Sequence, residues 1–276
     1  MKSLLIIILF CATAFGQKIL KTDENLNGVR SIKATIDLGT VELTLKRVHD
    51  AEKAFRIYYS YSEDEKVPVL EYETEGENGI FHLSNGKDGG HFPLFGMNGK
   101  KDSANIELAV SVPISLSMNF GVCDASVDLG GMEISDATFS TGVCSFDLTF
   151  SSANAIECDY INVKTGISSV SVENLANARA RRVEINGGLG SIKVDFGGKI
   201  ERDCSVSVKS GLGSVEISIP SSINTVISAP SGFLNSVDVS GFYSEGDGVY
   251  RSAVKSGPQL KLHIDSGLGG VTIKSY

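Results

Sequence analysis

The sequence predicts an all-β fold, organised as a β-solenoid of about seven coils with about 22 residues in each. Glycine recurs at a near-constant interval through the second half of the chain. Apolar and polar residues alternate with period two on both sides of these glycines, which is typical of strands with one buried face. The 276 residues include 30 glycines and are 42% hydrophobic, so the chain can bury a core, and no long segment shows a helical period.

The repeat is visible when seven segments, such as "NFGVCDASVDL" and "KSGLGSVEISI", are aligned on one glycine. Successive anchor glycines lie 21 to 24 residues apart, except for the last interval of 35, which contains the insertion "GFYSEGDGVYRSAVKSG". A tight corner needs a residue that tolerates positive φ or close backbone approach, and glycine meets both needs. We therefore expect the structural corners at Gly121, Gly142, Gly166, Gly188, Gly211, Gly232 and Gly267.

The side chains around each anchor predict which residues fill the core. Apolar residues stand five and three positions before the glycine and one position after it, and in most copies four and six positions after it. In "SGLGSVEISIP" this places Leu212, Val215 and Ile217 in the core, together with Ile219, while Glu216 and Ser218 face water. On this basis Leu212→Asp is expected to unfold the protein and Glu216→Ala to leave its stability almost unchanged.

The chain divides into three parts. Residues 1–16 have one basic residue, Lys2, then an apolar run and small residues, which is the pattern of a secretory signal peptide. Residues 17–104 form an N-terminal β region that caps or extends the solenoid, and residues 105–276 carry the repeats. We expect an exported protein, periplasmic, on the outer surface or secreted. No later segment is apolar enough for membrane insertion of the mature chain.

Four cysteines follow the predicted signal peptide. Cys123 and Cys144 both stand two residues after their anchors, so adjacent coils place their Cα atoms about 5 Å apart, within disulfide range. The pattern fits either a disulfide or two stacked, buried thiols. Cys158 and Cys204 belong to coils too far apart for a bridge.

Several kinds of functional site are disfavoured. "GLGSVE" lacks the third glycine of the dinucleotide fingerprint and precedes a strand, not a helix. The repeats carry no ladder of carboxylates for calcium, and the four histidines have no metal-ligand spacing. We expect no cofactor, no metal and no catalytic residues. The net charge of −8 argues against a nucleic-acid partner.

Two groups of residues are candidates for contact with a partner, each with a structural alternative. The first is a basic cluster that would otherwise be a solvated corner: Arg179, Arg181 and Arg182. The second lies in the insertion, which resembles a hairpin that would otherwise cap the last coils: Phe242, Tyr243 and Tyr250. The apolar loop around His91 is expected to cover one end of the core, or to bind a partner.

The order of the motifs resembles the toastrack (LiaF-like) family of bacterial envelope proteins, often labelled putative adhesins. The resemblance rests on "IDLGTVELTL", then "IELAVSVPISLSMNFGVCDASVDLGGMEISDATFSTGVCSFDLTF", and a final "SGLGGVTI". It covers nearly all of the mature chain. It implies a single-stranded right-handed β-helix and supplies no catalytic residues.

These observations favour a non-catalytic exported envelope or surface protein, an adhesin-like scaffold that binds a protein or glycan partner and has ends through which it could oligomerise. One alternative, from the resemblance alone, is an envelope-stress signalling component. A second is a polysaccharide-active β-helix enzyme, which would need paired carboxylates. The acidic residues lie instead on different outward columns, for example Asp128, Glu173, Asp195 and Glu216.

Overall fold

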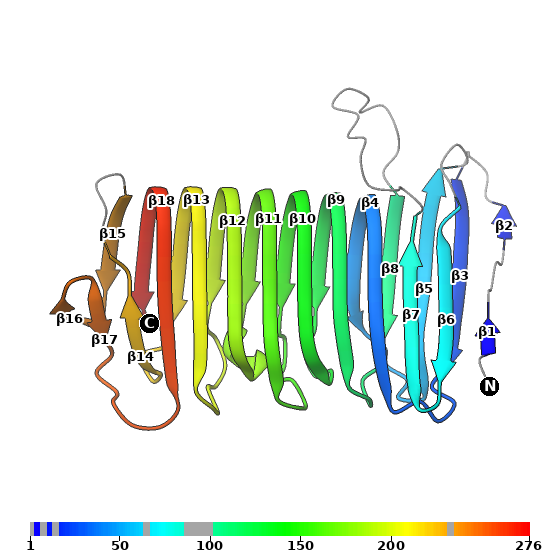
Figure 1. Cartoon of the computed structure of the whole chain (residues 1–276), viewed down its shortest axis with the longest axis horizontal. Coiled ribbons are helices and arrows are strands. Elements are labelled where there is room, and N and C mark those ends of the chain that lie inside the picture. The colour runs from blue at the N-terminus through cyan, green and yellow to red at the C-terminus, as the bar shows by residue number, and fades with distance from the viewer. Residues whose placement is uncertain (1–2, 6–9, 13–16, 63–66, 86–101, 231–234) are drawn as a thin grey trace.

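The computed structural model describes residues 3–5, 10–12, 17–62, 67–85, 102–230 and 235–276. Most of the predicted signal peptide, the loop around His91 and the predicted corner Gly232 lie outside these residues. The all-β prediction is confirmed: long strands stand side by side in one row, as in Figure 1. One short 3-10 helix, η1 (Leu175–Ala178), is present in the described part.

The body of the molecule is a stack of long strands that bend at a glycine. Each strand pairs in parallel with the next, residue for residue, from β4 to β18. Each coil therefore adds one layer to the sheet on both sides of the bend. In spatial order these strands are β4 (Ser31–Arg47), β9 (Ile114–Asp128), β10 (Ile134–Thr149), β11 (Cys158–Glu173), β12 (Ala180–Asp195), β13 (Cys204–Ile219) and β18 (Gln259–Ser275).

The two ends of the stack differ from its middle. Beyond β4 the next coil is split into β7 (Asn78–Ser84) and β8 (Asp102–Leu108), which both run parallel to β4. Beyond β18 it is split into β14 (Asn224–Ser228) and β15 (Asn235–Ser240), both parallel to β18. β4 lies in the predicted N-terminal region, yet it is a long bent strand whose Gly39 stacks beneath Gly121.

At the C-terminus the coils do not stack in the order of the chain. β18, the last strand of the chain, pairs with β13 on one side and with β14 and β15 on the other. The insertion explains how this is achieved, because β17 (Val249–Arg251) runs back antiparallel along β14 before the chain enters β18. β14 thus has β17 on one edge and β18 on the other.

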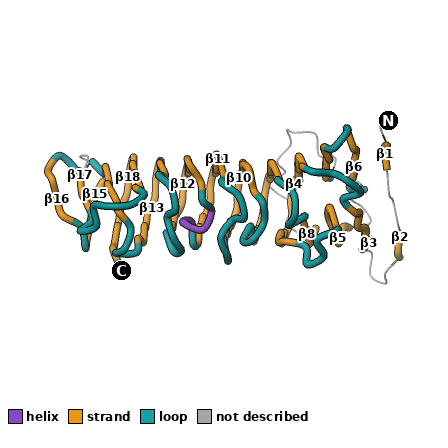
Figure 2. Tube along the Cα trace, turned by 90° about the horizontal axis from the view of Figure 1, so that it is seen from below, coloured by secondary structure: helices purple, strands orange, loops and turns teal. Residues whose placement is uncertain are grey.

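Antiparallel strands cover both ends of the parallel stack. At the N-terminal end β5 (Lys53–Ser62) pairs with β8, β3 (Gln17–Asn25) pairs with β5, and β6 (Val69–Glu75) pairs with β7. At the other end β17 pairs with β16 (Tyr243–Gly246). Figure 2 shows these caps at the two ends of the row. The remaining short strands pair with β6 and β3, respectively, and lie within the predicted signal peptide: β1 (Ser3–Leu5) and β2 (Phe10–Ala12).

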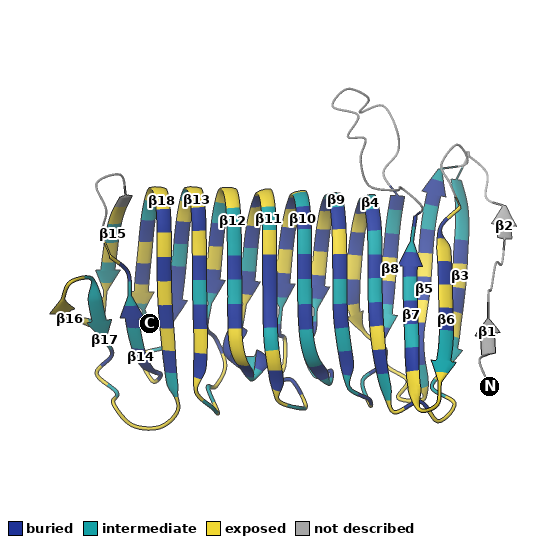
Figure 3. Cartoon of the chain, in the orientation of Figure 1, coloured by how far each residue is buried: buried dark blue, intermediate teal, exposed yellow. Residues whose placement is uncertain are grey.

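The core lies between the two arms of the bent strands. Burial alternates along each arm, seen in Figure 3 as blue bands. In β9 the inward residues are Leu116, Met118 and Phe120 before the corner and Cys123, Ala125 and Val127 after it. The buried positions are thus five, three and one before the glycine and two, four and six after it.

The prediction that the residue directly after the glycine fills the core is wrong. Leu212 is 49% exposed, whereas Val215, Ile217 and Ile219 are buried as expected. Strict alternation fails because the corner consists of two residues, the glycine and the one after it, and the residues that flank this pair both point inward. In later coils the position directly before the glycine holds small polar residues, such as Ser210. The polar character of these residues gave no sign in the sequence that the position is buried.

Close packing of backbone on backbone explains the glycine repeat. A Cβ atom on Gly121 would lie 2.7 Å from the carbonyl oxygen of Gly39, and one on Gly211 would lie 2.6 Å from that of Gly188. Side chains do not fit at such distances. Gly213 adds a second constraint, because its φ is +147° and a Cβ there would collide with the carbonyl oxygen of Gly190.

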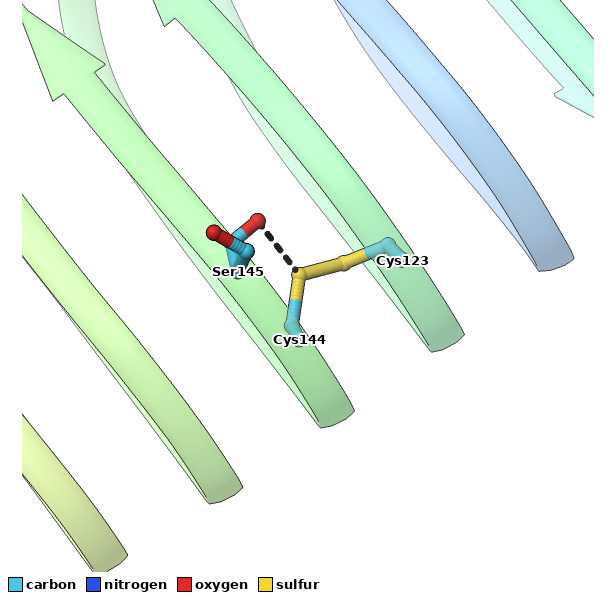
Figure 4. The surroundings of a disulfide bond; sticks show 3 residues. All are labelled: Cys123, Cys144 and Ser145. Atoms are coloured by element: carbon cyan, nitrogen blue, oxygen red, sulfur yellow. Dashed lines mark hydrogen bonds between the residues drawn. A yellow bond between two sulfur atoms is a disulfide. The ribbon is translucent and has the colours of Figure 1, made fainter.

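Cys123 and Cys144 form a disulfide between β9 and β10, with their Cα atoms 4.6 Å apart (Figure 4). Both residues are buried two positions after their anchor glycines. Cys158 and Cys204 are buried free thiols, and burial raises the pKa of each to about 12. Neither of these two thiols is therefore ionised near neutral pH.

Gly211→Ala is expected to lower the free energy of unfolding by about 1–3 kcal/mol, because neighbouring coils must separate to admit the methyl group. Gly270→Ala is the matched control, since a Cβ there has its nearest neighbour, the Ser236 hydroxyl, at 3.7 Å. Chemical denaturation of both variants measures the difference. Equal stability of the two would contradict the packing argument.

Leu212→Asp is now expected to change the stability by less than about 1 kcal/mol, because the side chain is half exposed. Val215→Asp, three residues away and 1% exposed, is expected to cost more than about 4 kcal/mol by burying an unpaired charge. Urea titrations followed by circular dichroism would compare them. If Leu212→Asp unfolded the protein, the assignment of the corner would be wrong.

Loss of the disulfide is expected to lower stability by about 3 kcal/mol, since it closes a loop across 21 residues of sequence. The measurement is denaturation of the wild type and of Cys123→Ser/Cys144→Ser, each with and without reductant. The reductant should destabilise the wild type and leave the double variant unchanged. An equal effect on both proteins would place the sensitivity elsewhere in the chain.

Candidate functional site

The corners present a continuous line of apolar side chains along the molecule, which we call the corner ridge. Each member directly follows its corner glycine and lies in register with the next member. Five of the six are 42–55% exposed. In Figure 3 exposed residues mark this edge at the top of the later strands. The corner ridge consists of Val122, Val143, Ile167, Leu189, Leu212 and Leu268.

The ridge is exposed because its neighbours cannot cover it. The preceding residue of each coil is glycine, and in β12, β13 and β18 the following residue is also glycine. In these coils the second glycines have positive φ: Gly190, Gly213 and Gly269. In β9, β10 and β11 the same position holds inward side chains, namely Cys123, Cys144 and Ser168. No side chain adjacent in sequence can therefore fold over the ridge.

One side of the ridge is an open groove of about 410 Å³ that we call the serine groove. Its outer wall is a column of serines from successive coils, Ser145, Ser169 and Ser191. The hydroxyls of Ser169 and Ser191 lie 3.1 Å apart and are hydrogen-bonded. The disulfide, Ser168 and Gly190 also line the groove, which has no charged lining residue.

The other side of the ridge is a second open groove, of about 610 Å³, that we call the lysine groove. Its lining includes an outward polar column of Asn119, Ser140, Lys164 and Asn186. Small residues from the inward position before the glycine also line it, for example Thr141. This groove offers amides, hydroxyls and one cation.

The three predicted partner-binding arginines make different contacts. The guanidinium of Arg179 donates to the carbonyl oxygens of Asn154 and Ala155, so this residue holds two loops together. Arg182 lies over the Tyr160 ring at 5.3 Å from its centroid. Arg181, whose side chain is 64% exposed, lies 3.5 Å from Asp159. Each of the three arginines thus has a contact within the chain.

The predicted aromatic group is divided in a similar way. The insertion forms the β16–β17 hairpin, and Phe242 and Tyr250 pack against the core. Tyr243 is 67% exposed. The hairpin therefore covers the end of the stack and leaves one aromatic ring accessible.

Two of the acidic residues on the outward columns have structural partners, and the described residues hold no cluster of metal ligands. No group of three or more His, Cys, Asp or Glu side chains in that part of the chain could hold a metal ion. Asp128 accepts hydrogen bonds from the backbone N–H groups of Gly130 and Ser151, and Glu216 accepts one from Lys274 at 2.7 Å. These acids contribute to loop and strand packing.

The sequence contained a signal for the ridge that the alternation rule concealed. In "GLG" the leucine stands between two glycines in three coils, and such a residue has no adjacent side chain to shield it. The serines three residues after the anchors form a second regular column. Together these two patterns indicate a surface line and not a core position.

Within the described residues, no helix reaches the length and apolarity needed to cross a bilayer. No curated protein matches the sequence. Solved structures that are similar to this chain include one from Clostridium sporogenes and one from Bacteroides fragilis. A "putative cell adhesion protein" from Clostridium sporogenes has a TM-score of 0.51 and 20% identity, with 94% of this chain and 100% of that chain covered. A "putative adhesin" from Bacteroides fragilis has a TM-score of 0.36 and 14% identity, with 94% and 97% covered.

The first of these structures shares the fold of this chain. The family model described as the "N-terminal domain of toast_rack, DUF2154" matches residues 15–173, which is more than half of the sequence and includes the corners from Gly39 to Gly166. The chain belongs to the toast_rack family.

Proposed function

We propose that this chain is a non-catalytic, exported envelope or surface protein that binds a protein or glycan partner along its corner ridge. The observation that carries the proposal is the unbroken line of half-exposed aliphatic side chains between two open grooves. Soluble proteins seldom expose contiguous apolar surface unless it contacts something else. An extended line with shallow sides suits a long partner better than a small substrate.

The chemistry of the surface supports binding over turnover. Glycoside cleavage needs two convergent carboxylates about 5–10 Å apart beside a bound sugar. Among the described residues, none that lines either groove is acidic. The aliphatic character of the ridge favours a protein partner, since sugar rings are usually held by aromatic side chains. Amides and hydroxyls in the lysine groove could still hydrogen-bond a glycan.

The adhesin-like role draws support from fold similarity. The Clostridium sporogenes structure, which covers nearly the whole of this chain, is described as a "putative cell adhesion protein". Similar folds do not by themselves share a function, so the ridge is the part of the proposal that can be tested directly.

The test is a binding assay with the purified chain immobilised and exposed to envelope proteins and to a glycan array. Ile167→Lys/Leu189→Lys, in the middle of the ridge, is expected to weaken binding by about tenfold or more. Val69→Lys, which charges a similarly exposed apolar residue in β6, is the control and should bind like the wild type. Equal binding by all three proteins, or turnover of a polysaccharide, would refute the proposal.

A further inference from the structure

We propose that the corner ridge packs into the serine groove of a second copy of this chain, with the two solenoids side by side and parallel. The inference goes beyond the proposed function, although it uses the same surface. A two-fold axis parallel to the stack would place the ridge of each copy in the serine groove of the other. Such a contact is isologous, since both copies use the same patch.

The spacing of the coils along the stack matches that of a second copy. Each coil supplies one ridge residue and one groove residue, and successive coils pair residue for residue. The stacked Cys123 and Cys144 show the repeat distance, with Cα atoms 4.6 Å apart. Only a partner with the same repeat can contact every coil in an equivalent way, and a second copy has that repeat by construction. Identical ladders of side chains interlock by this rule in steric zippers.

The charge of the surface beside the ridge also favours a second copy. The protein has a net charge of −8, so two copies repel each other unless they meet on a surface that lacks acids. From β10 to β13 the column on the serine side is uncharged in every coil: Ser145, Ser169, Ser191 and Ser214. Beyond this stretch, the first acid in this column is Asp124, in β9. In the outward column that lines the lysine groove, the first acid beyond this stretch is Asp265, in β18.

The two grooves differ in whether a charged side chain lines them. The lysine groove contains Lys164, and Lys209 continues its outward column. An apolar ridge that entered this groove would have to desolvate a cation without a partner. The serine groove presents hydroxyls that bond to each other and a floor of small or buried residues. It accepts an aliphatic ridge without leaving a charge unpaired.

The test is sedimentation velocity of the purified chain over a concentration series. The wild type should dimerise reversibly, and Ile167→Asp should raise the dimer dissociation constant by about tenfold or more. Two serines of one strand, β10, give the matched pair. Ser145→Lys, in the serine groove, should weaken the dimer as Ile167→Asp does, while Ser140→Lys, in the lysine groove, should not. Thermal melts establish that each variant is folded, and Leu189→Asp replaces Ile167→Asp if the latter is not.

Three results would overturn the inference: a wild type that stays monomeric at millimolar concentration, a dimer that survives both ridge and groove variants, or a dimer broken only by Ser140→Lys. Ridge-dependent binding of a monomeric wild type to vesicles of anionic lipid would assign the ridge to a membrane surface instead. The proposed function fails separately. A ridge-dependent dimer that captures no envelope protein or glycan refutes that function and supports this inference. A monomer that captures an envelope protein or glycan through the ridge supports that function and refutes this inference.

Discussion

The close approach of backbones at the glycine corners is the constraint on which the rest of the structure depends. At these corners the carbonyl oxygen of one coil lies too close to the place where a Cβ atom of the next coil would be, as between Gly188 and Gly211, where the distance would be 2.6 Å. This approach keeps the two arms of every coil in parallel register with the coils before and after it. A side chain at one corner would separate two coils and weaken hydrogen bonding on both arms, so the effect would spread along the stack.

The same constraint creates the surface that we propose is functional. A corner without side chains cannot shield the residue beside it, so the ridge residue is exposed in coil after coil. Exposed Leu and Ile give up the favourable free energy that burial would supply. The fold therefore makes a straight apolar line at regular spacing without any dedicated loop, and the line runs from β9 to β18.

The ends of the stack face a different problem, because an unpaired parallel strand invites uncontrolled pairing with other chains. At the N-terminal end the two halves of the split coil are followed by the antiparallel β5 and β6, and at the C-terminal end β17 covers β14, one half of the split coil. At the C-terminal end this arrangement requires the last strand of the chain to enter between β13 and β14. Closing the fold there depends on contacts that are distant in sequence, which tends to slow folding. The disulfide lies toward the other end of the stack, between β9 and β10.

The sequence alone was enough to predict the all-β class, the spacing of the corners and most of the core, because period-two alternation and recurrent glycines are local properties of the chain. It also placed Cys123 beside Cys144, since both keep the same distance from their glycines. The tertiary structure was needed to show that Leu212 points outward, because two inward residues flank the bend and the alternation shifts by one residue there. It was also needed to place Gly39 in the glycine column and β18 between β13 and β14. The coils have nearly equivalent sequence patterns, so the choice of neighbour depends on how the caps and the insertion return the chain.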